Sequence, residues 1–228
     1  MSSRAAPDPQ ALYRMQVGAW VSSRLQRTPN ALKIPAQNLD LYVVRDFLNK
    51  KECEDLISRI DIDRVPSTIL AESEQDPEFR TSESCNLNPY DPVVRAIEDK
   101  INALMGIDRV QGETAQGQRY AVGQQFKAHN DFFHTSQPYW KEMERTGGQR
   151  TWTAMIFLND VESGGQTAFP TVNVKVTPRA GNLLAWNNMD KFGMPNPATL
   201  HTGMPVLAGT KYIITKWYRE RPWAAVAG

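Results

Sequence analysis

Cysteine is scarce in this sequence, which limits how the fold can be held together. Only Cys53 and Cys85 occur among the 228 residues, so several disulfides cannot form, and a reducing compartment fits the chain better. Cys53 also falls at 3- and 4-residue spacings with Leu56, Ile57 and Ile60, which is typical of the buried face of a helix. We interpret Cys53 as a small buried apolar residue and not as a nucleophile.

The chain lacks an excess of charge of either sign. Its 26 Lys and Arg residues are balanced by 25 Asp and Glu residues, which gives a formal net charge of +1. Such a balance provides no broad basic surface for nucleic acid or for anionic lipid. We therefore expect neither nucleic acid nor membrane among the partners.

Long apolar runs are missing as well. Residues 1–10 contain prolines and charged residues but no hydrophobic stretch of signal-peptide length. No later stretch is apolar over the length that a membrane-spanning helix needs. These observations predict a cytoplasmic protein.

Helical patterns are concentrated before residue 107. Asn49 and Glu52 stand in the register of a capping box, which marks the start of one helix. Asp91 is suited to cap a second helix, which is expected to stop at Gly106. With an irregular apolar stripe near the N-terminus, the pattern predicts three helices, at about residues 12–25, 49–60 and 91–105.

Beyond Gly106 the pattern changes to short extended runs separated by Gly, Pro and Asn. This alternation is typical of a sandwich or barrel of many short strands, here preceded by helices. The sequence therefore predicts a mainly β, α+β protein. The expected strands are Leu39–Phe47 and, further on, Gln118–Val122, Thr151–Leu158, Val172–Val176, Asn182–Trp186, Met204–Leu207 and Lys211–Tyr218.

Histidine is also rare, and its three positions, 129, 134 and 201, suggest a metal site. His129 and Asp131 lie two positions apart, so both side chains would project from one side of an extended strand. Two His and one carboxylate, with adjacent coordination positions left open, are the ligand set of non-haem Fe(II) oxygenases. His201 could supply the third ligand. Taken alone, His-x-Asp also fits an ordinary hydrogen-bonded surface pair.

The residues around this pair follow a longer pattern. The run Gln118–Phe133 resembles the prolyl 4-hydroxylase family of 2-oxoglutarate-dependent oxygenases, in its short, bacterial-type form, whose pattern there is Tyr-x-x-Gly-x-x-Tyr-x-x-His-x-Asp-x-Phe. Phe47-Leu48 and Arg80-Thr81-Ser82 also fall where the family has similar residues. The resemblance continues in order through residues 150–160 (Arg-x-x-Thr-x-x-x-Tyr-Leu-Asn-Asp), 164–169 (Gly-Gly-x-Thr-x-Phe) and 201–217, where the family has its distal His and basic anchor.

This resemblance implies a fold. The family core is a double-stranded β-helix, the jelly-roll or cupin-like fold, here braced by N-terminal helices. We expect an N-terminal extension with one helix over residues 1–38, a single dioxygenase domain over 39–221, and a tail over 222–228. Within the domain, residues 48–106 would give helical support and 107–221 the jelly-roll core.

The resemblance also implies ligands for Fe(II) and for the cosubstrate 2-oxoglutarate. His129, Asp131 and His201 would hold the metal. Lys211, ten residues after His201, would meet the far carboxylate of 2-oxoglutarate, with Tyr120 and Thr153 nearby. A buried ammonium needs an opposite charge, which the dicarboxylate would provide.

These three cosubstrate residues have simpler interpretations as well. Lys211 could be a solvated lysine of a strand. Tyr120 and Thr153 could be core residues with satisfied hydroxyl groups.

Two further residues match the substrate entrance of the family. Arg150 could bind peptide carbonyls, and the ring of Trp217 could lie against a prolyl ring. Their alternatives are a surface arginine and a core tryptophan. Phe126 and Phe157 depart from the family, because both stand where tyrosine is usual.

The implied reaction is the hydroxylation of an unactivated C–H bond with O2, coupled to conversion of 2-oxoglutarate to succinate and CO2. A proline of a protein or peptide is the expected substrate, as in a procollagen-proline 4-dioxygenase, and ascorbate the expected reductant. Another residue or a small molecule could replace proline. From a different class, a cupin-like protein could use the metal to bind a carboxylate ligand without turning it over.

Overall fold

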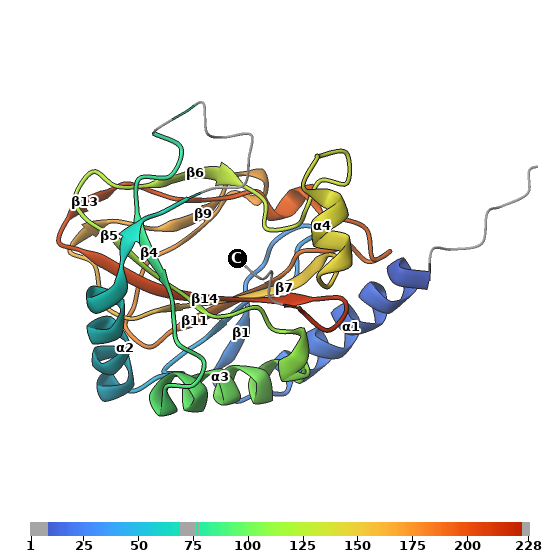
Figure 1. Ribbon diagram of the computed structural model, residues 1–228, viewed down its shortest axis with the longest axis horizontal. Helices are drawn as coiled ribbons and strands as arrows, with labels where there is room; N and C mark the ends of the chain where they lie inside the picture. The colour runs from blue at the N-terminus through green and yellow to red at the C-terminus, as the bar shows by residue number, and fades with distance from the viewer. Residues whose placement is uncertain (1–8, 69–75, 77, 225–228) are drawn as a thin grey trace, which may run out of the picture.

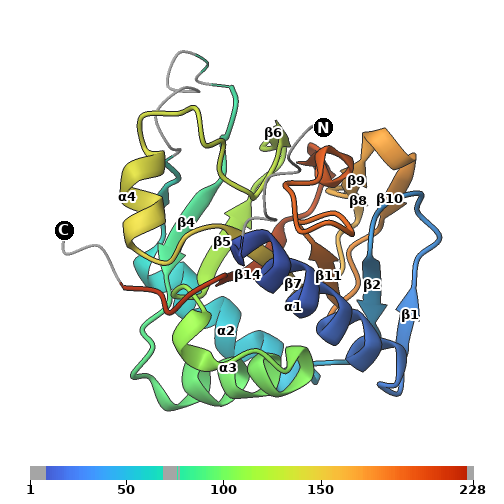
Figure 2. The same ribbon diagram turned by 90° about the vertical axis from the view of Figure 1, so that its right-hand side faces the viewer.

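The computed structural model describes residues 9–68, 76 and 78–224. Two β-sheets face each other, and three helices lie along the outer side of the larger sheet (Figures 1 and 2). Within the described part of the chain, no helix combines the length and apolar character needed to cross a membrane.

The larger sheet has eight strands among the described residues, in the order β1-β2-β11-β7-β14-β5-β4-β3. All of its pairings are antiparallel. Its strands are β1 (Ala31–Lys33), β2 (Leu41–Val44), β3 (Val65–Pro66), β4 (Glu83–Asn86), β5 (Gln116–Tyr120), β7 (Arg150–Phe157), β11 (Leu183–Asn187) and β14 (Lys211–Arg219).

The opposite wall is made of shorter strands. A four-stranded sheet runs β10-β9-β12-β6, and β13 pairs with β8 beside it. These strands are β6 (Phe126–His129), β8 (Ser163–Gly164), β9 (Thr167–Phe169), β10 (Val174–Val176), β12 (His201–Gly203) and β13 (Val206–Ala208).

The three predicted helices are present, and two have the expected caps. The helices are α1 (Pro9–Gln26), α2 (Lys50–Asp63), α3 (Pro92–Met105) and a short α4 (Trp140–Arg145). Asn49 and Glu52 form both hydrogen bonds of the capping box. Asp91 accepts hydrogen bonds from Val93 and Val94, and Gly106 ends α3 with φ of 66°, in the left-handed region that favours glycine.

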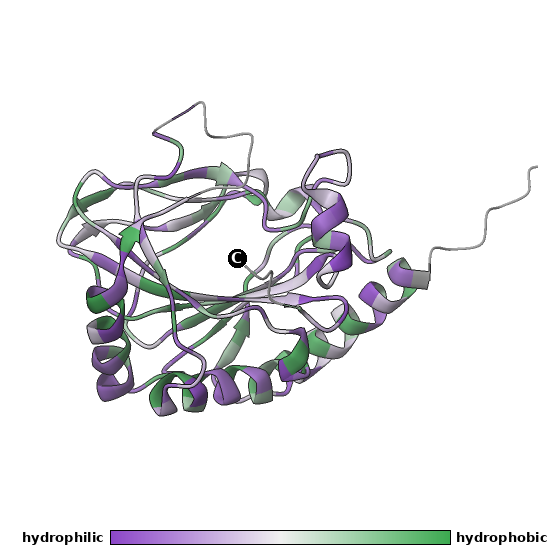
Figure 3. Cartoon of the chain, viewed as in Figure 1, coloured by the Kyte–Doolittle hydropathy of each residue, from purple (hydrophilic) through white to green (hydrophobic). Residues whose placement is uncertain are grey.

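Two apolar clusters hold these layers together. One fills the space between helices and large sheet, and Figure 3 shows polar and apolar residues alternating around α2 and α3. Cys53 is buried there, as predicted. The cluster includes Val21, Leu25, Leu56, Ile60, Ile97, Ile101, Trp152 and Tyr218. The second cluster lies between the two sheets and includes Tyr120, Met155, Phe157, Phe169, Leu184, Trp186 and Ile213.

Strand register places the predicted site residues between the sheets. In the large sheet, Lys211 of β14 lies opposite Tyr120 of β5, and Trp217 lies opposite Thr153 of β7. In the smaller sheet, His201 of β12 lies directly opposite His129 of β6. Directly paired residues point to the same face, so the two sheets present these side chains to one enclosed space.

Candidate active site

The two histidines of the predicted triad are held by backbone carbonyls. His129 Nδ1 is 2.8 Å from the carbonyl oxygen of Lys127, and His201 Nδ1 is 2.9 Å from that of Thr199. Because a carbonyl can only accept, each Nδ1 carries the hydrogen and each Nε2 keeps a free lone pair. Metal-binding histidines ordinarily donate the hydrogen of their other ring nitrogen to a carbonyl or carboxylate in this way.

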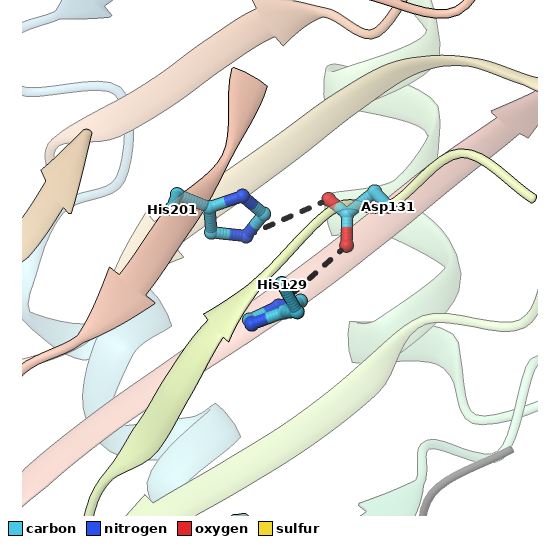
Figure 4. A group of neighbouring side chains, drawn as sticks. All are labelled: His129, Asp131 and His201. Atoms are coloured by element: carbon cyan, nitrogen blue, oxygen red, sulfur yellow. Dashed lines mark ion pairs between the residues drawn. The ribbon is translucent and has the colours of Figure 1, made fainter. Parts of the chain in front are cut away.

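Asp131 completes the group (Figure 4). Strand β6 ends at His129, so of the His-x-Asp pair only the histidine lies in a strand, and the expected extension to Asp131 is wrong. The carboxylate nevertheless faces both rings, with 3.9 Å from His129 Nε2 to Asp131 Oδ1 and 3.9 Å from His201 Nε2 to Asp131 Oδ2. These distances are too long for hydrogen bonds and leave room for an ion.

The charge states suit a divalent cation. Burial, together with the neighbouring His201, lowers the pKa of His129 to about 3. Burial opposes the charge of Asp131, but His201, His129 and Arg150 outweigh it and lower the pKa of this carboxyl. Two imidazoles with free lone pairs and one carboxylate, all within 4.8 Å of one another, fit Fe(II) as a ligand set. The described residues contain no other group of three such side chains.

A hydrogen-bond chain behind Asp131 fixes its orientation. Thr153 donates its hydroxyl hydrogen to Asp131 Oδ2 at 2.7 Å, and Asn188 Nδ2 donates to the Thr153 hydroxyl at 2.9 Å. Aromatic rings flank the imidazoles: Phe126 stacks on His129 at 3.6 Å, and Trp186 meets His201 edge-on at 4.8 Å. These hydrogen bonds and ring contacts therefore hold the triad side chains in place.

Lys211 is buried without an ion pair. Its side chain is 1% exposed, and its Nζ lies 5.2 Å from the ring of Tyr120 and 5.7 Å from that of Phe157. No carboxylate among the described residues pairs with Lys211, and burial lowers its pKa to about 7. The site thus lacks an anion that would stabilise the ammonium.

A cavity of about 930 Å³ opens in front of His129 and Asp131. Arg150, predicted as a substrate residue, lines this cavity together with Trp217, and its guanidinium lies 4.2 Å from the Trp217 ring. The same guanidinium donates two hydrogen bonds, of 2.6 and 2.7 Å, to Glu113. Arg219 donates to Glu113 as well, at 2.6 Å.

Arg80 lines another part of the cavity. It donates to the Thr68 carbonyl at 3.1 Å and to Gln116 Oε1 at 2.8 Å, and its guanidinium lies 4.7 Å from the Phe126 ring. No ion pair to Arg80 occurs within the described ranges. In the sequence, Arg80 stands out only as part of Arg80-Thr81-Ser82, where the family has similar residues.

Several residues of the site carried no sequence signal. Glu113 lies in a stretch without a motif, and its contact with Arg150 joins residues 37 positions apart. Asn188 and Thr153 are separated by 35 positions. Neither partner could be found from spacing, because only the folded register brings the strands together.

Comparison with known proteins assigns the class. The model of the 2OG-Fe(II) oxygenase superfamily matches residues 115–219. The chain is 30% identical to Prolyl 4-hydroxylase 2 of Arabidopsis thaliana over 215 residues, which cover 83% of this chain and 70% of the relative. It is 36% identical to Prolyl 4-hydroxylase subunit alpha-1 of Rattus norvegicus over 146 residues, 63% of this chain but only 27% of that subunit.

A solved structure supports the same assignment. The viral collagen prolyl hydroxylase of Paramecium Bursaria Chlorella virus-1, in its 2OG complex, superposes with a TM-score of 0.62 and 27% identity, covering 80% of this chain and 96% of the viral one. Fold and sequence together define an Fe(II)- and 2-oxoglutarate-dependent dioxygenase with a jelly-roll fold, as predicted. Within that class, the chain belongs to the prolyl 4-hydroxylase family.

The hydrogen bond behind Asp131 gives a first prediction. Thr153→Val removes the hydroxyl but keeps the shape, so Asp131 loses its donor and should bind metal about 10- to 100-fold more weakly. Titration of the apoprotein with Mn(II), followed by calorimetry, measures this affinity. Thr151→Val is the control, because Thr151 lies in the same strand but bonds the carbonyl of Tyr218. Equal affinities in both variants would contradict the prediction.

Proposed function

We propose that this enzyme hydroxylates a proline residue of a protein or peptide. The observation that carries the proposal is the His129–Asp131–His201 triad, whose His129 and Asp131 face a cavity of about 930 Å³, together with a buried lysine, Lys211, beside Tyr120. With 2-oxoglutarate bound, Fe(II) supplies the O2 chemistry that inserts one oxygen atom into a C–H bond and the other into succinate, with release of CO2.

On this proposal His129, Asp131 and His201 hold Fe(II). The carbonyls of Lys127 and Thr199 keep both Nε2 atoms directed at the metal. The hydroxyl of Thr153 keeps the carboxylate turned toward them. Contacts of this kind orient the ligand atoms of a metal site.

Lys211, Tyr120 and Thr153 form the cosubstrate pocket in this proposal. Lys211 binds the far carboxylate of 2-oxoglutarate, and the resulting ion pair satisfies the buried ammonium. Tyr120 lies beside it with its ring 5.2 Å from Nζ. Phe157 adds an apolar wall that keeps water from the pair.

Arg150 and Trp217 bind the substrate on the open side of the metal. Glu113 fixes Arg150 through two hydrogen bonds that use Nε and Nη2, so the Nη1 donors can reach a peptide carbonyl. Proline-rich segments dock on aromatic surfaces, and the Trp217 ring offers one beside the Arg150 guanidinium. The Trp217 Nε1 atom itself is buried and has no hydrogen-bond partner among the described residues, so the ring offers its face and not this donor.

The proposal has four wider parts. Residues 39–221 act as one catalytic domain, with 1–38 as an extension and 222–228 as a tail. The enzyme works in the cytoplasm. Its partners are a proline-containing polypeptide and O2, without nucleic acid or membrane. Ascorbate restores iron that has been oxidised.

The reaction is tested by removing one ligand. His201→Ala should abolish the release of succinate from 2-oxoglutarate in the presence of a proline-containing peptide, because two ligands cannot hold the metal in place. For the comparison variant His134→Ala, Mn(II) affinity should equal that of the wild type, because His134 lines the cavity but lies outside the triad. Undiminished succinate release by His201→Ala would disprove the assignment.

The cosubstrate anchor is tested at Lys211. Lys211→Met keeps the length of the side chain and removes its charge, so 2-oxoglutarate loses a buried ion pair of about 3–5 kcal/mol. The dissociation constant should rise by at least about 100-fold. Calorimetry on the Mn(II)-loaded protein measures it; a change below about threefold would exclude Lys211 as the anchor.

Lys211 also predicts a pH dependence. Its pKa of about 7 means that the ammonium form is populated below that pH and the neutral amine above it. A dicarboxylate binds the ammonium form, so 2-oxoglutarate affinity should be constant below pH 7 and fall about tenfold per pH unit above it. Lys211→Arg should remove this slope, because arginine stays charged throughout. A slope shared by both proteins would assign the titration to another group.

A further inference from the structure

Gln118 is a buried polar residue whose position connects the substrate cavity to the cosubstrate pocket. It is 3% exposed and lies in β5 between Gln116 and Tyr120. Because side chains alternate along a strand, residues 116, 118 and 120 share the face that looks into the enclosed space. In the register of the sheet they lie opposite Thr215, Ile213 and Lys211 of β14.

The amide group of Gln118 uses all of its hydrogen-bonding atoms. Tyr120 donates its hydroxyl hydrogen to Gln118 Oε1 at 2.7 Å. Gln118 Nε2 donates to Gln116 Oε1 and to Thr215 Oγ1, both at 3.2 Å. Gln116 Oε1 also accepts from Arg80 Nη2 at 2.8 Å. Arg80 and Gln116 of the cavity are thus joined through Gln118 to Tyr120, with Thr215 as a branch.

Arg80 fixes the direction of every bond in this chain. A guanidinium can only donate, so Gln116 must turn its oxygen toward Arg80. That oxygen requires the amide nitrogen of Gln118, which leaves Gln118 Oε1 to face Tyr120. Burial raises the pKa of Tyr120, so its hydroxyl keeps the proton at neutral pH. The Tyr120 hydrogen is therefore committed to Gln118.

The hydrogen bond from Tyr120 to Gln118 competes with the hydrogen bond that a carboxylate of 2-oxoglutarate would accept from Tyr120. Both oxygens of an ionised carboxylate only accept, so Tyr120 can bind 2-oxoglutarate only by withdrawing its hydrogen from Gln118. Cosubstrate binding then leaves Gln118 Oε1 without its donor in a buried site, which is unfavourable.

We propose that Gln118 is a positioning residue that holds the Tyr120 hydroxyl away from 2-oxoglutarate and thereby weakens cosubstrate binding. The inference rests on the proposed function, in which Tyr120 and Lys211 bind 2-oxoglutarate. Its distinctive consequence is that replacing a fully hydrogen-bonded buried glutamine with an apolar residue improves binding. A glutamine that only supports the sheet would give the opposite result.

The test is a double-mutant cycle on the Mn(II)-loaded protein, with 2-oxoglutarate binding measured by calorimetry. Gln118→Met should tighten binding about 2- to 10-fold, the range of one hydrogen bond released from competition. Tyr120→Phe removes the hydroxyl, so Gln118→Met should then have no effect, and the double variant should match Tyr120→Phe within twofold. Gln118→Leu serves as a second variant if the methionine protein does not fold.

Arg119→Met is the matched control. Arg119 lies in the same strand on the opposite face, where it bonds Glu83 and Tyr212. The Arg119→Met variant loses only these bonds, so its affinity for 2-oxoglutarate should equal that of the wild type. Weaker or unchanged 2-oxoglutarate binding by Gln118→Met would overturn this inference but not the proposed function. The same would hold if Gln118→Met tightened binding equally in the wild type and in Tyr120→Phe. Absence of 2-oxoglutarate binding in the wild-type protein would overturn the proposed function along with it.

Discussion

The antiparallel pairing of β6 with β12 is the constraint on which the metal site depends. It places His129 and His201 directly opposite each other, although 72 positions separate them in the sequence. Both rings then bond a backbone carbonyl two residues earlier in the chain, which fixes the same tautomer in each. A slip of one residue would turn one ring to the other face of the sheet and remove the site.

The larger sheet contributes in a different way. Its strands β5, β7 and β14 are long enough to carry the buried lysine, the threonine behind Asp131 and the arginine of the cavity on one continuous support. Apolar packing against the helices stabilises that support. The fold therefore buries Lys211 without a counter-charge, which lowers the pKa of its amine, and on the proposed function a dicarboxylate ligand would relieve this cost.

Features set by neighbouring residues could be predicted from the sequence, and features set by register could not. The capping box at Asn49, the helix stop at Gly106 and the His-x-Asp pair are each defined by residues only a few positions apart. By contrast, α4 is only six residues long and shows no clear period, and β1 has three residues. Glu113 and Asn188 gain their roles from strands far away in the chain. Family resemblance pointed to Lys211, but it did not point to the hydrogen-bonded Gln116 and Gln118 beside it.

Glu113 illustrates how charge balance organises the substrate side. One carboxylate accepts from both Arg150 and Arg219, and all three side chains are largely buried. Because a carboxylate neutralises one guanidinium, the wall keeps a net positive charge beside the metal ligands. If the Arg150 side chain moved away, the buried Glu113 carboxylate would keep only its contact with Arg219. This loss is unfavourable, so Arg150 stays in place. If Arg150 binds the substrate as proposed, a peptide carbonyl would therefore meet a fixed guanidinium and would have to adapt to it.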